Sequence, residues 1–336
     1  MTQPVWLPRV YAHAMEYIVR FVNNPGVERI VREFDTLYVD VKDPDERLDY
    51  LSKLAAKHWD FRRGRERFEI TEIQPMDELG SELGVSIMRG ARQLEMATSS
   101  SATCKHYSML AVLGGANMSP YYRMRYALEQ HVTYDMLVYL GSEREIFLPE
   151  QEIVKHYAAH ALTEFDLGKG AIVSLIGSQL ADTGEYDLVT SEWHIARLQR
   201  DDGLPIFLLS APPFLGNGRA NTADTYDFMR RIEQEALTPT KNILFATGSM
   251  YRYAQYFDAV REISLRTGVD IEVIGYEPRY ADNNFKPSQF LQELKAAVDA
   301  AVRLRDTMER NVTGNEWREH YYNRFKRDEA NRPVKA

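Results

Sequence analysis

The stretch "LAVLGGANMSPYYRMRYALE", residues 110–129, joins an apolar run to two glycines, a polar turn and a helix-forming segment. The residues 108–115, SMLAVLGG, predict a buried strand that runs into the glycines, and Ser119 followed by Pro120 predicts a capped helix start with proline at the first helical position. The Gly114–Gly115 pair between them suits a positive φ or a close approach of the backbone to a ligand. Backbone N–H groups at the start of the following helix favour an anion there. The stretch therefore predicts the strand–turn–helix unit with which many α/β proteins hold a phosphate or a nucleotide.

Downstream of this unit, apolar runs keep alternating with amphipathic segments. Further strands are expected at residues 133–141, 204–213, 241–249 and 269–278, and helices at residues 119–131, 148–162, 220–236 and 250–268. Strands and helices that alternate in this way imply right-handed crossovers and a parallel sheet that is covered on both faces. The predicted fold class is therefore α/β, with a parallel sheet of about five strands and flanking helices.

The residues before this region favour an all-helical arrangement. Apolar residues recur at helical spacing in residues 11–22 and 43–59, and more weakly in residues 77–97. An insertion at residues 164–203 is expected to add a helix or a hairpin over one edge of the sheet. We therefore divide the chain into a helical N-terminal region (1–105), an α/β domain (106–280), and a C-terminal helix from Ser288 with a charged tail (281–336).

Charge and composition exclude several classes of protein. The 49 acidic and 41 basic residues leave a net charge of −8, which argues against broad nucleic-acid binding, because such binding needs a cationic surface. The single cysteine, Cys104, excludes an internal disulfide and a cysteine-rich zinc site. Neither a membrane span nor a secretory signal is expected, because charged residues interrupt every long apolar stretch. We therefore expect a cytoplasmic protein with no membrane partner; its oligomeric state stays open, a homo-oligomer included.

Small and polar residues follow the predicted strands. In open parallel sheets ligands bind beyond the carboxyl ends of the strands, so these residues are the candidates for a ligand site. The ligand-binding residues expected from this placement are Gly114, Gly115, Asn117, Ser142, Asn221, Thr222, Thr247 and Ser249. Because the chain contains neither G-x-G-x-x-G at this turn nor G-x-x-x-x-G-K-[ST] anywhere, a nicotinamide enzyme and a P-loop NTPase are not expected.

Three charged residues are the candidates for catalysis. Glu143 and Asp224 follow predicted strands. A carboxylate at such a place can act as a general acid or base, or it can accept a hydrogen bond from a ribose hydroxyl. Asp224 also lies in the first turn of its predicted helix, where a carboxylate stabilises the helix dipole. Arg123 follows the glycine turn within reach of an anion. Arg125 stands two residues further on and points another way, so at most one of the two arginines serves the site.

Two groups of histidines have alternative interpretations. His156 and His160 stand four residues apart on a predicted helix, but the sequence H-Y-A-A-H lacks the glutamate of H-E-x-x-H, so no metal site is predicted. His194, beside Trp193 in the insertion, is either a lid residue over a ligand or part of a packed aromatic edge.

Several segments occur in the order of motifs of a known family. The glycine turn after the first strand, the strand that ends at Gly141–Ser142, the Asn221–Thr222 pair and the strand that ends in Thr247 resemble the YdcF-like family, which contains SanA and ElyC, over residues 108–278. The resemblance implies a Rossmann-like fold. It also implies a pocket with Arg123 and Asp224. Tyr251 stands where that family has a His and Ala254 where it has an Arg, with Arg252 nearby, so Tyr251 and Arg252 are the expected ligand-binding residues at this place. One member is described as binding S-adenosylmethionine, so the resemblance implies that cofactor.

The leading hypothesis is a binder of a nucleotide-like small molecule, S-adenosylmethionine among the expected ligands, at the carboxyl edge of the sheet. Group transfer is the expected reaction if the protein is an enzyme. One alternative is a hydrolase or a phosphoryl- or glycosyl-transfer enzyme that uses Glu143 or Asp224 with Arg123. Another is a non-catalytic interaction protein that makes its contacts through the N-terminal helices. Fold alone does not choose among them.

Overall fold

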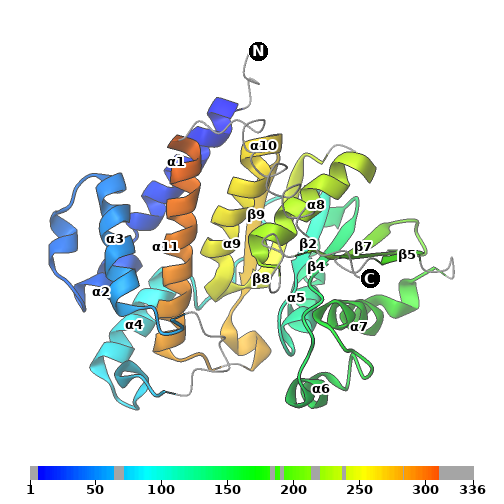
Figure 1. The fold of residues 1–336 in the computed structure, drawn as a ribbon, viewed down its shortest axis with the longest axis horizontal. Coiled ribbons are helices and arrows are strands. Elements are labelled where there is room, and N and C mark those ends of the chain that lie inside the picture. Colours follow the sequence, from blue (N-terminus) through cyan, green and yellow to red (C-terminus); the bar gives the residue numbers. More distant parts are fainter. Residues whose placement is uncertain are drawn as a thin grey trace, which may run out of the picture.

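The structure is a computed structural model, and it describes residues 7–63, 72–181, 186–189, 193–212, 220–236, 240–282 and 284–309. A seven-stranded sheet forms the centre of its α/β part. The strands lie in the order β5-β6-β7-β4-β2-β8-β9 (Figure 1). Their bounds are β2 Met109–Leu113, β4 Leu137–Gly141, β5 Tyr186–Val189, β6 His194–Gln199, β7 Pro205–Ser210, β8 Asn242–Gly248 and β9 Asp270–Tyr276. The α/β class and a mostly parallel sheet, both predicted, are confirmed.

Five strands of the sheet are parallel, and all five lie within the predicted segments. From β2 the chain moves outward to β4 and β7 on one side, and then returns to place β8 and β9 on the other side. Val112 lies beside both Tyr139 of β4 and Ala246 of β8, so β2 is the central parallel strand. The direction of winding therefore reverses between β2 and β8, which makes their carboxyl ends the switch point of the topology.

The two remaining strands of this sheet come from the insertion. β5 and β6 pair antiparallel, and β6 extends the sheet by pairing antiparallel with β7. The expected hairpin is therefore present at the edge, while residues 182–185 and 190–192 of the insertion lie outside the described residues. The segment predicted as one strand at 133–141 forms two strands, β3 (Thr133–Tyr134) and β4. β3 pairs with β1 (His106–Tyr107) in a separate two-stranded sheet.

The helix predicted at residues 148–162 is wrong in its length. α6 spans only Leu148–Val154, and the crossover helix that packs on the sheet is α7, Glu164–Ile176, which the sequence placed in the insertion. Residues 162–165 run beside residues 142–146 instead of continuing a helix: Ile146 N donates to Leu162 O at 2.9 Å, and Phe165 N donates to Ser142 O at 3.0 Å. The helical spacing of apolar residues in 155–162 therefore does not produce a helix, because the backbone that follows pairs with residues 142–146.

Helices cover both faces of the sheet. α5 (Ser119–Leu128) and α7 bury apolar residues against one face, and α8 (Thr222–Ala236) and α9 (Arg252–Ala259) against the other. Successive residues of β2 point to opposite faces of the sheet. Leu110 and Val112 belong to the apolar core under α5 and α7, and Ala111 and Leu113 belong to the core under α8 and α9. Beyond α9 the helical path continues through the π-helix η6 (Val260–Ser264) and α10 (Leu265–Thr267), within the predicted segment 250–268.

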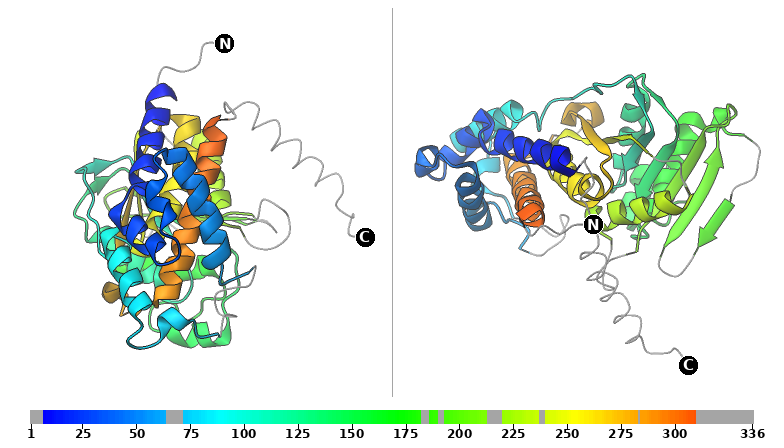
Figure 2. Two further views of the ribbon diagram at one scale, coloured as in Figure 1. Left: turned by 90° about the vertical axis from the view of Figure 1, so that its left-hand side faces the viewer. Right: turned by 90° about the horizontal axis from the view of Figure 1, so that it is seen from above.

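The N-terminal region is helical, as predicted. Its helices are α1 Leu7–Val22, α2 Pro25–Arg32, α3 Pro44–His58 and α4 Glu82–Gln93, and the predicted C-terminal helix is α11, Pro287–Glu309. α11 packs against α3, α4 and α9, so the C-terminal helix lies between the N-terminal helices and the sheet (Figures 1 and 2). Asp77 fixes the start of α11 by accepting from Ser288 N at 2.9 Å and from Ser288 Oγ at 2.6 Å. The predicted domain boundaries stay a prediction, and the tail after Asn311 lies outside the described residues.

Where the chain is described, none of its helices has the length and apolar character needed to cross a membrane.

Candidate functional site

The glycine turn lies at the carboxyl end of β2, where Gly114 N donates to Leu140 O at 2.6 Å. A Cβ on Gly114 would collide with Glu164 Oε1 and lie 2.7 Å from Leu140 O, so crowding by a carboxylate and a neighbouring strand explains this glycine. Neither Gly114 nor Gly115 has a positive φ; the left-handed residue of this turn is Asn117, with φ of 53°. Glycine is therefore required at residue 114 because neighbouring atoms leave no room for a Cβ, and not because the backbone has a positive φ there.

The helix after the turn begins differently from the prediction. Ser119 is the first residue of α5, and the N-cap residue is Met118, which makes no side-chain capping hydrogen bond. The predicted cap by the Ser119 hydroxyl is therefore wrong, because the chain turns into the helix one residue earlier. The start of α5 is left without a capping side chain, while Ala116 and Asn117 of the turn are exposed to solvent.

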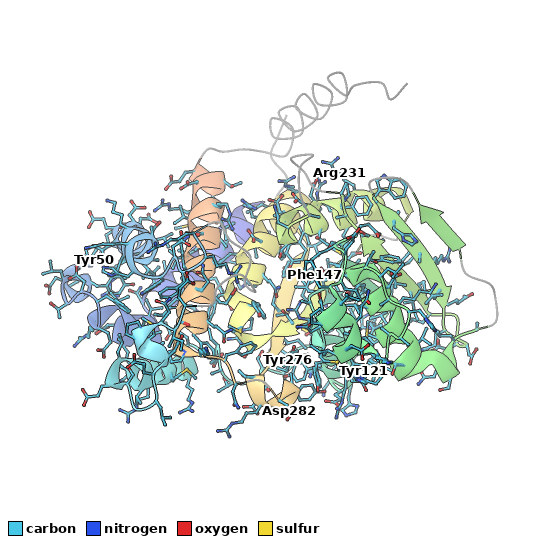
Figure 3. All side chains as sticks on the ribbon, turned by 60° about the horizontal axis from the view of Figure 1, so that its bottom comes forward. Tyr50, Tyr121, Phe147, Arg231, Tyr276 and Asp282 are labelled. Atoms are coloured by element: carbon cyan, nitrogen blue, oxygen red, sulfur yellow. The ribbon has the colours of Figure 1, made fainter. Side chains whose placement is uncertain are left out.

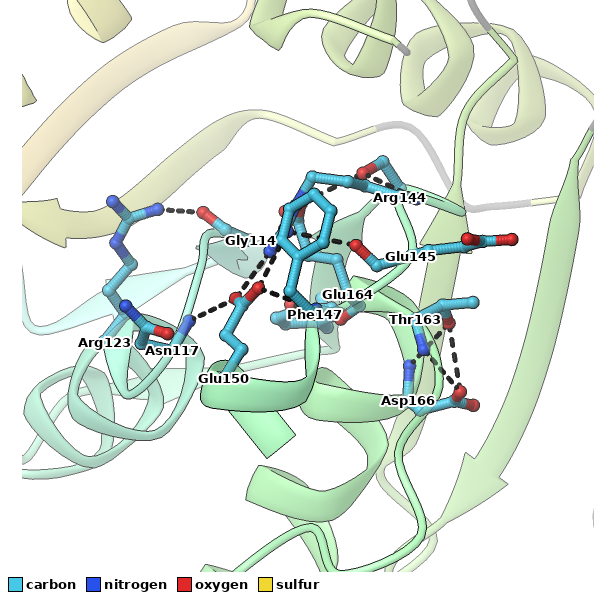
Figure 4. A network of polar contacts seen from close by, with 12 residues as sticks. Gly114, Asn117, Arg123, Arg144, Glu145, Phe147, Glu150, Thr163, Glu164 and Asp166 are labelled. Atoms are coloured by element: carbon cyan, nitrogen blue, oxygen red, sulfur yellow. Dashed lines mark hydrogen bonds and ion pairs between the residues drawn. The ribbon is translucent and has the colours of Figure 1, made fainter. Parts of the chain in front are cut away.

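Arg123 is buried at this edge of the sheet, with 5% of its surface exposed. Its Nη1 donates to Leu113 O at 3.1 Å and to Gly114 O, so the guanidinium lies directly at the end of β2 (Figure 4). Its Nε has no hydrogen-bond partner, and no carboxylate of the described residues forms an ion pair with it. A buried guanidinium without a counter-charge is costly, which makes Arg123 the strongest candidate for an anion ligand at this site.

Arg125 has a different environment, as expected from its position two residues further on. It is half-exposed and pairs with Glu129 one turn along α5, with Nε 2.9 Å from Oε1. Its guanidinium also lies over the ring of Tyr280, 5.3 Å from the ring centre. Of the two arginines, Arg123 therefore faces the candidate site.

Tyrosine rings surround the guanidinium of Arg123 on the side of β8 and β9. The Tyr251 ring centre lies 5.4 Å from Arg123 Cζ, within cation–π range. Burial raises the pKa of Tyr276, and the nearby charge of Arg123 partly offsets that rise. Tyr276 also contacts Tyr122 and Tyr126 of α5, and the cluster continues to Tyr121, which Figure 3 labels together with Tyr276. Aromatic surface therefore borders the arginine.

A network of two carboxylates and one arginine lies on the opposite side of the turn (Figure 4). Arg144 pairs in a bidentate manner with Glu150, at 2.7 and 2.9 Å, and its Nε lies 3.5 Å from Glu164 Oε2. Ser142 Oγ donates to the same Glu164 oxygen at 3.0 Å. Asn117 N donates to Glu150 Oε1 at 2.8 Å, so the network holds the turn in place. The predicted residues Ser142 and Asn117 thus belong to one polar cluster around Gly114.

The pKa of Glu150 lies below its ordinary value. Burial by itself raises this pKa, but the hydrogen bonds from Arg144 and from the N–H of Asn117, together with the charge of Arg144, lower it by more. Glu150 is therefore a charged structural partner of Arg144. The carboxylate of Glu164, by contrast, accepts hydrogen bonds through Oε2; in the described part of the chain, no hydrogen bond reaches Oε1.

Glu150 and Glu164 are the carboxylates that the sequence analysis missed. Thr163 to Asp166 form a capping box, in which Thr163 Oγ1 accepts from Asp166 N and Asp166 Oδ2 accepts from Thr163 N. This signal is readable in the sequence and would have placed a helix start at Glu164. That Glu164 lies against Gly114 follows from the tertiary structure alone.

Glu143, the predicted catalytic carboxylate, is half-exposed and points to the insertion. Its Oε1 lies 3.6 Å from Nδ1 of His194, whose ring stacks on Phe165 with 3.9 Å between ring centres. His194 therefore has the packed aromatic environment that was one of its two interpretations. The roles of Glu143 and His194 toward a ligand stay predictions.

Asn221, Thr222 and Asp224 lie at the start of α8. Asn221 Oδ1 accepts from Asp224 N at 3.1 Å and from Ala223 N at 2.8 Å, and Asp224 Oδ2 accepts from Asn221 N at 2.9 Å. These bonds form a reciprocal helix cap, with Thr222 as the first helical residue. Helix capping accounts for both polar side chains, and a binding role for all three residues stays a prediction.

The remaining predicted residues lie at the end of β8 and after it. Thr247 is fully buried, and among the described residues its Oγ1 has no hydrogen-bond partner. Ser249 Oγ donates to Met96 O at 2.7 Å, and Arg252 Nη2 donates to Glu95 Oε2 at 2.7 Å. Ser249 and Arg252 therefore connect the sheet to the end of the N-terminal region.

The described residues contain no group of three or more His, Cys, Asp or Glu side chains that could hold a metal ion. His156 and His160 lie beyond the end of α6 at Val154, so they do not share the helix on which the sequence placed them.

Comparisons with known proteins match the N-terminal region and part of the remaining chain. The family described as Rv3785 N-terminal domain matches residues 10–87, the region that holds α1 to α4. Proteins named "Uncharacterized protein Rv3785" from Mycobacterium tuberculosis and "Uncharacterized protein Mb3814" from Mycobacterium bovis are each 27% identical over 235 residues, which are 65% of this chain and 65% of the relative. The chain thus spans less than two thirds of the length of these curated relatives. No solved structure matches the chain.

These findings correct the resemblance to the YdcF-like family. The family model that matches is that of the Rv3785 N-terminal domain, and the similar proteins include those named Rv3785 and Mb3814. The motifs behind the resemblance are short and consist of strand ends, glycines and helix starts, which many α/β proteins share because the backbone requires them. The expectation of S-adenosylmethionine therefore loses the resemblance on which it was based.

Proposed function

We propose that the chain binds an anionic, nucleotide-like small molecule at the carboxyl edge of the sheet, with Arg123 holding its anionic group. One observation carries this proposal. Arg123 is buried at the end of β2, its Nε is unpaired, and among the described residues it has no carboxylate partner. An anionic ligand supplies the missing counter-charge, and a guanidinium suits phosphate and carboxylate groups because it donates several parallel N–H bonds.

The surroundings of Arg123 support the same conclusion. The start of α5 carries no side-chain cap, and its helix dipole favours negative charge near the turn, although Ser119 N already donates to Ala116 O at 3.1 Å and Pro120 has no N–H. Gly114 and Gly115 are partly exposed, so the turn is within reach of a small molecule. The tyrosines beside the arginine offer flat apolar surface for a ring system.

The topology supports a nucleotide-like ligand. The five parallel strands lie in the order β7-β4-β2-β8-β9, which corresponds to the doubly wound order 3-2-1-4-5, and we therefore assign the sheet to the Rossmann-like class. Ligands of such sheets bind outside the carboxyl ends at the switch point, which here lies between β2 and β8. Arg123 stands at the end of β2, and Tyr251 follows β8 directly. Group transfer stays our proposal for a reaction, if the bound molecule is converted.

Binding is tested by thermal unfolding of the purified chain with inorganic phosphate, AMP, ADP, S-adenosylmethionine and S-adenosylhomocysteine. A ligand at one hundred times its Kd should stabilise the fold by about 2.7 kcal/mol, which raises the Tm by a few degrees. We expect a phosphate-bearing ligand to do this. The Arg123→Met variant should lose the shift, Arg123→Lys should keep part of it, and Arg125→Met, on the same helix, should keep all of it.

Two results would contradict the proposal. One is the absence of a shift with every anionic ligand of the panel. The other is an equal shift in wild type and Arg123→Met, provided that circular dichroism shows both to be folded. Retention of the shift by Arg123→Met with loss in an Asn221→Ala variant would instead move the site to the start of α8.

A further inference from the structure

We infer that Glu164 accepts a hydrogen bond from a hydroxyl group of the same ligand. The site then binds a phosphorylated molecule with free hydroxyls, such as a ribonucleotide. This inference rests on the proposed function and specifies its ligand class. It concerns the first residue of α7, a helix that the sequence analysis did not connect with the site.

The geometry places two opposite charges on the two sides of one glycine. Arg123 Nη1 contacts the carbonyl oxygen of Gly114, and Glu164 Oε1 lies against its α-carbon, where a Cβ would collide with it. The side chain of Glu164 is 12% exposed, so its carboxylate is largely removed from water. Arg123 and Glu164 do not pair with each other. The end of β2 therefore presents a guanidinium on one side of Gly114 and a carboxylate on the other, each with an unused hydrogen-bonding position.

The two oxygens of Glu164 differ in their partners. Oε2 accepts from Ser142 Oγ at 3.0 Å and lies 3.5 Å from Arg144 Nε. These bonds orient the carboxylate. Oε1 accepts no hydrogen bond from the described residues and faces the glycine turn. Oε1 is not one of the fully buried unpaired atoms of the described residues, so it is accessible, and a ligand O–H or N–H can donate to it in place of water.

Charge decides which ligand group each side prefers. Arg144 is already engaged by both oxygens of Glu150, so the cluster of Arg144, Glu150 and Glu164 carries a net charge of −1. A phosphate is therefore repelled on this side of Gly114 and attracted to Arg123, while a neutral hydroxyl is favoured at Glu164. A ligand that carries both groups satisfies both sides of the turn.

The test compares AMP with 2′,3′-dideoxy-AMP, which carry the same phosphate and base but differ in their ribose hydroxyls. Titration calorimetry is done on wild type, Glu164→Gln, and Glu152→Gln, whose exposed carboxylate on α6 serves as the matched control. We expect wild type and Glu152→Gln to bind AMP about tenfold more tightly than the dideoxy compound, the effect of one hydrogen bond to a charged group. Glu164→Gln should bind both compounds with the affinity that wild type has for the dideoxy compound.

The outcomes separate this inference from the proposed function. If wild type binds both nucleotides equally, or if Glu164→Gln keeps the preference for AMP, the inference is overturned while binding through Arg123 stands. If neither nucleotide binds, the proposed function and the inference fail together. A Ser142→Ala variant gives a second reading: it frees Glu164 Oε2 and should weaken the preference without abolishing binding of the dideoxy compound.

Discussion

Asn221 and Asp224 hydrogen-bond each other's backbone N–H groups across the first turn of α8, at 3.1 and 2.9 Å. The two residues therefore satisfy donors that a helix start otherwise leaves unpaired. Each had been predicted to bind a ligand, and the cap is a structural reason for the same two residue types at the same spacing.

We expect Asn221→Ala and Asp224→Ala each to lower the free energy of unfolding by about 1 kcal/mol, because each removes one half of the cap. Asn221→Ser should retain most of the stability, since serine caps helices well. Urea denaturation measures all three variants. Unchanged stability together with lost nucleotide binding would show that these residues serve a ligand instead of the helix.

A second prediction concerns the glycine between Arg123 and Glu164. Gly114→Ala should destabilise the protein by about 1–3 kcal/mol, because the new methyl group meets Glu164 Oε1 and the backbone oxygen of Leu140. Gly177→Ala is the control, since a Cβ there meets only Val173 Cγ1 at 3.5 Å. Thermal unfolding compares the two variants. Equal Tm values for both would contradict the close approach of Glu164 to the turn.

A third prediction concerns the ion pair at the centre of the polar network. Arg144→Met should cost about 3–5 kcal/mol of stability, because it leaves two largely buried carboxylates without their cation. The double variant Arg144→Met/Glu150→Gln should recover part of this loss by removing one of the unpaired charges.

The control for that experiment is a pair at the surface. Arg200→Met breaks the contact with the exposed Asp202 and should cost less than about 1 kcal/mol. A loss of similar size for Arg144→Met and Arg200→Met would show that the network around Glu150 contributes no more than a surface pair.

The fourth prediction is a pH dependence from Glu150. Its pKa in the folded chain lies below the ordinary glutamate value of 4.5, so the unfolded chain takes up a proton first as the pH falls. The contribution of Glu150 to stability is therefore complete above pH 4.5 and is lost as the pH falls through the lowered pKa. Urea unfolding between pH 3 and pH 6 should show a smaller loss in Glu150→Gln than in wild type. Glu152→Gln, an exposed neighbour, should follow the wild-type curve.

Local signals predicted the elements that carry the site. The apolar run in residues 109–113, the glycine pair and the helix that follows them were readable because strand and helix patterns depend on neighbouring residues. The same holds for β8, β9 and α11. Errors occurred where a distant segment decided the local structure: the segment at 155–162 does not stay helical, because residues 162–165 pair with residues 142–146.

The candidate site was predicted in part for the same reason. Arg123 lies close in sequence to the glycine turn, and helical geometry directs its side chain back toward that turn. Glu164 approaches the turn from the first residue of α7, fifty positions further along the chain. No spacing rule connects it with Gly114.

The sequence by itself determined the five strands that run parallel, most of the helices around them, and that Gly114 and Arg123 share one strand–turn–helix unit. These properties follow from the periodicity of apolar residues and from the short range of backbone hydrogen bonds in a helix or turn. The tertiary structure decided that Arg123 lacks a carboxylate partner, that Arg144 joins Glu150 to Glu164, and that α11 packs among the N-terminal helices. Such contacts join residues far apart in the chain, and they form only when whole elements pack their apolar faces together.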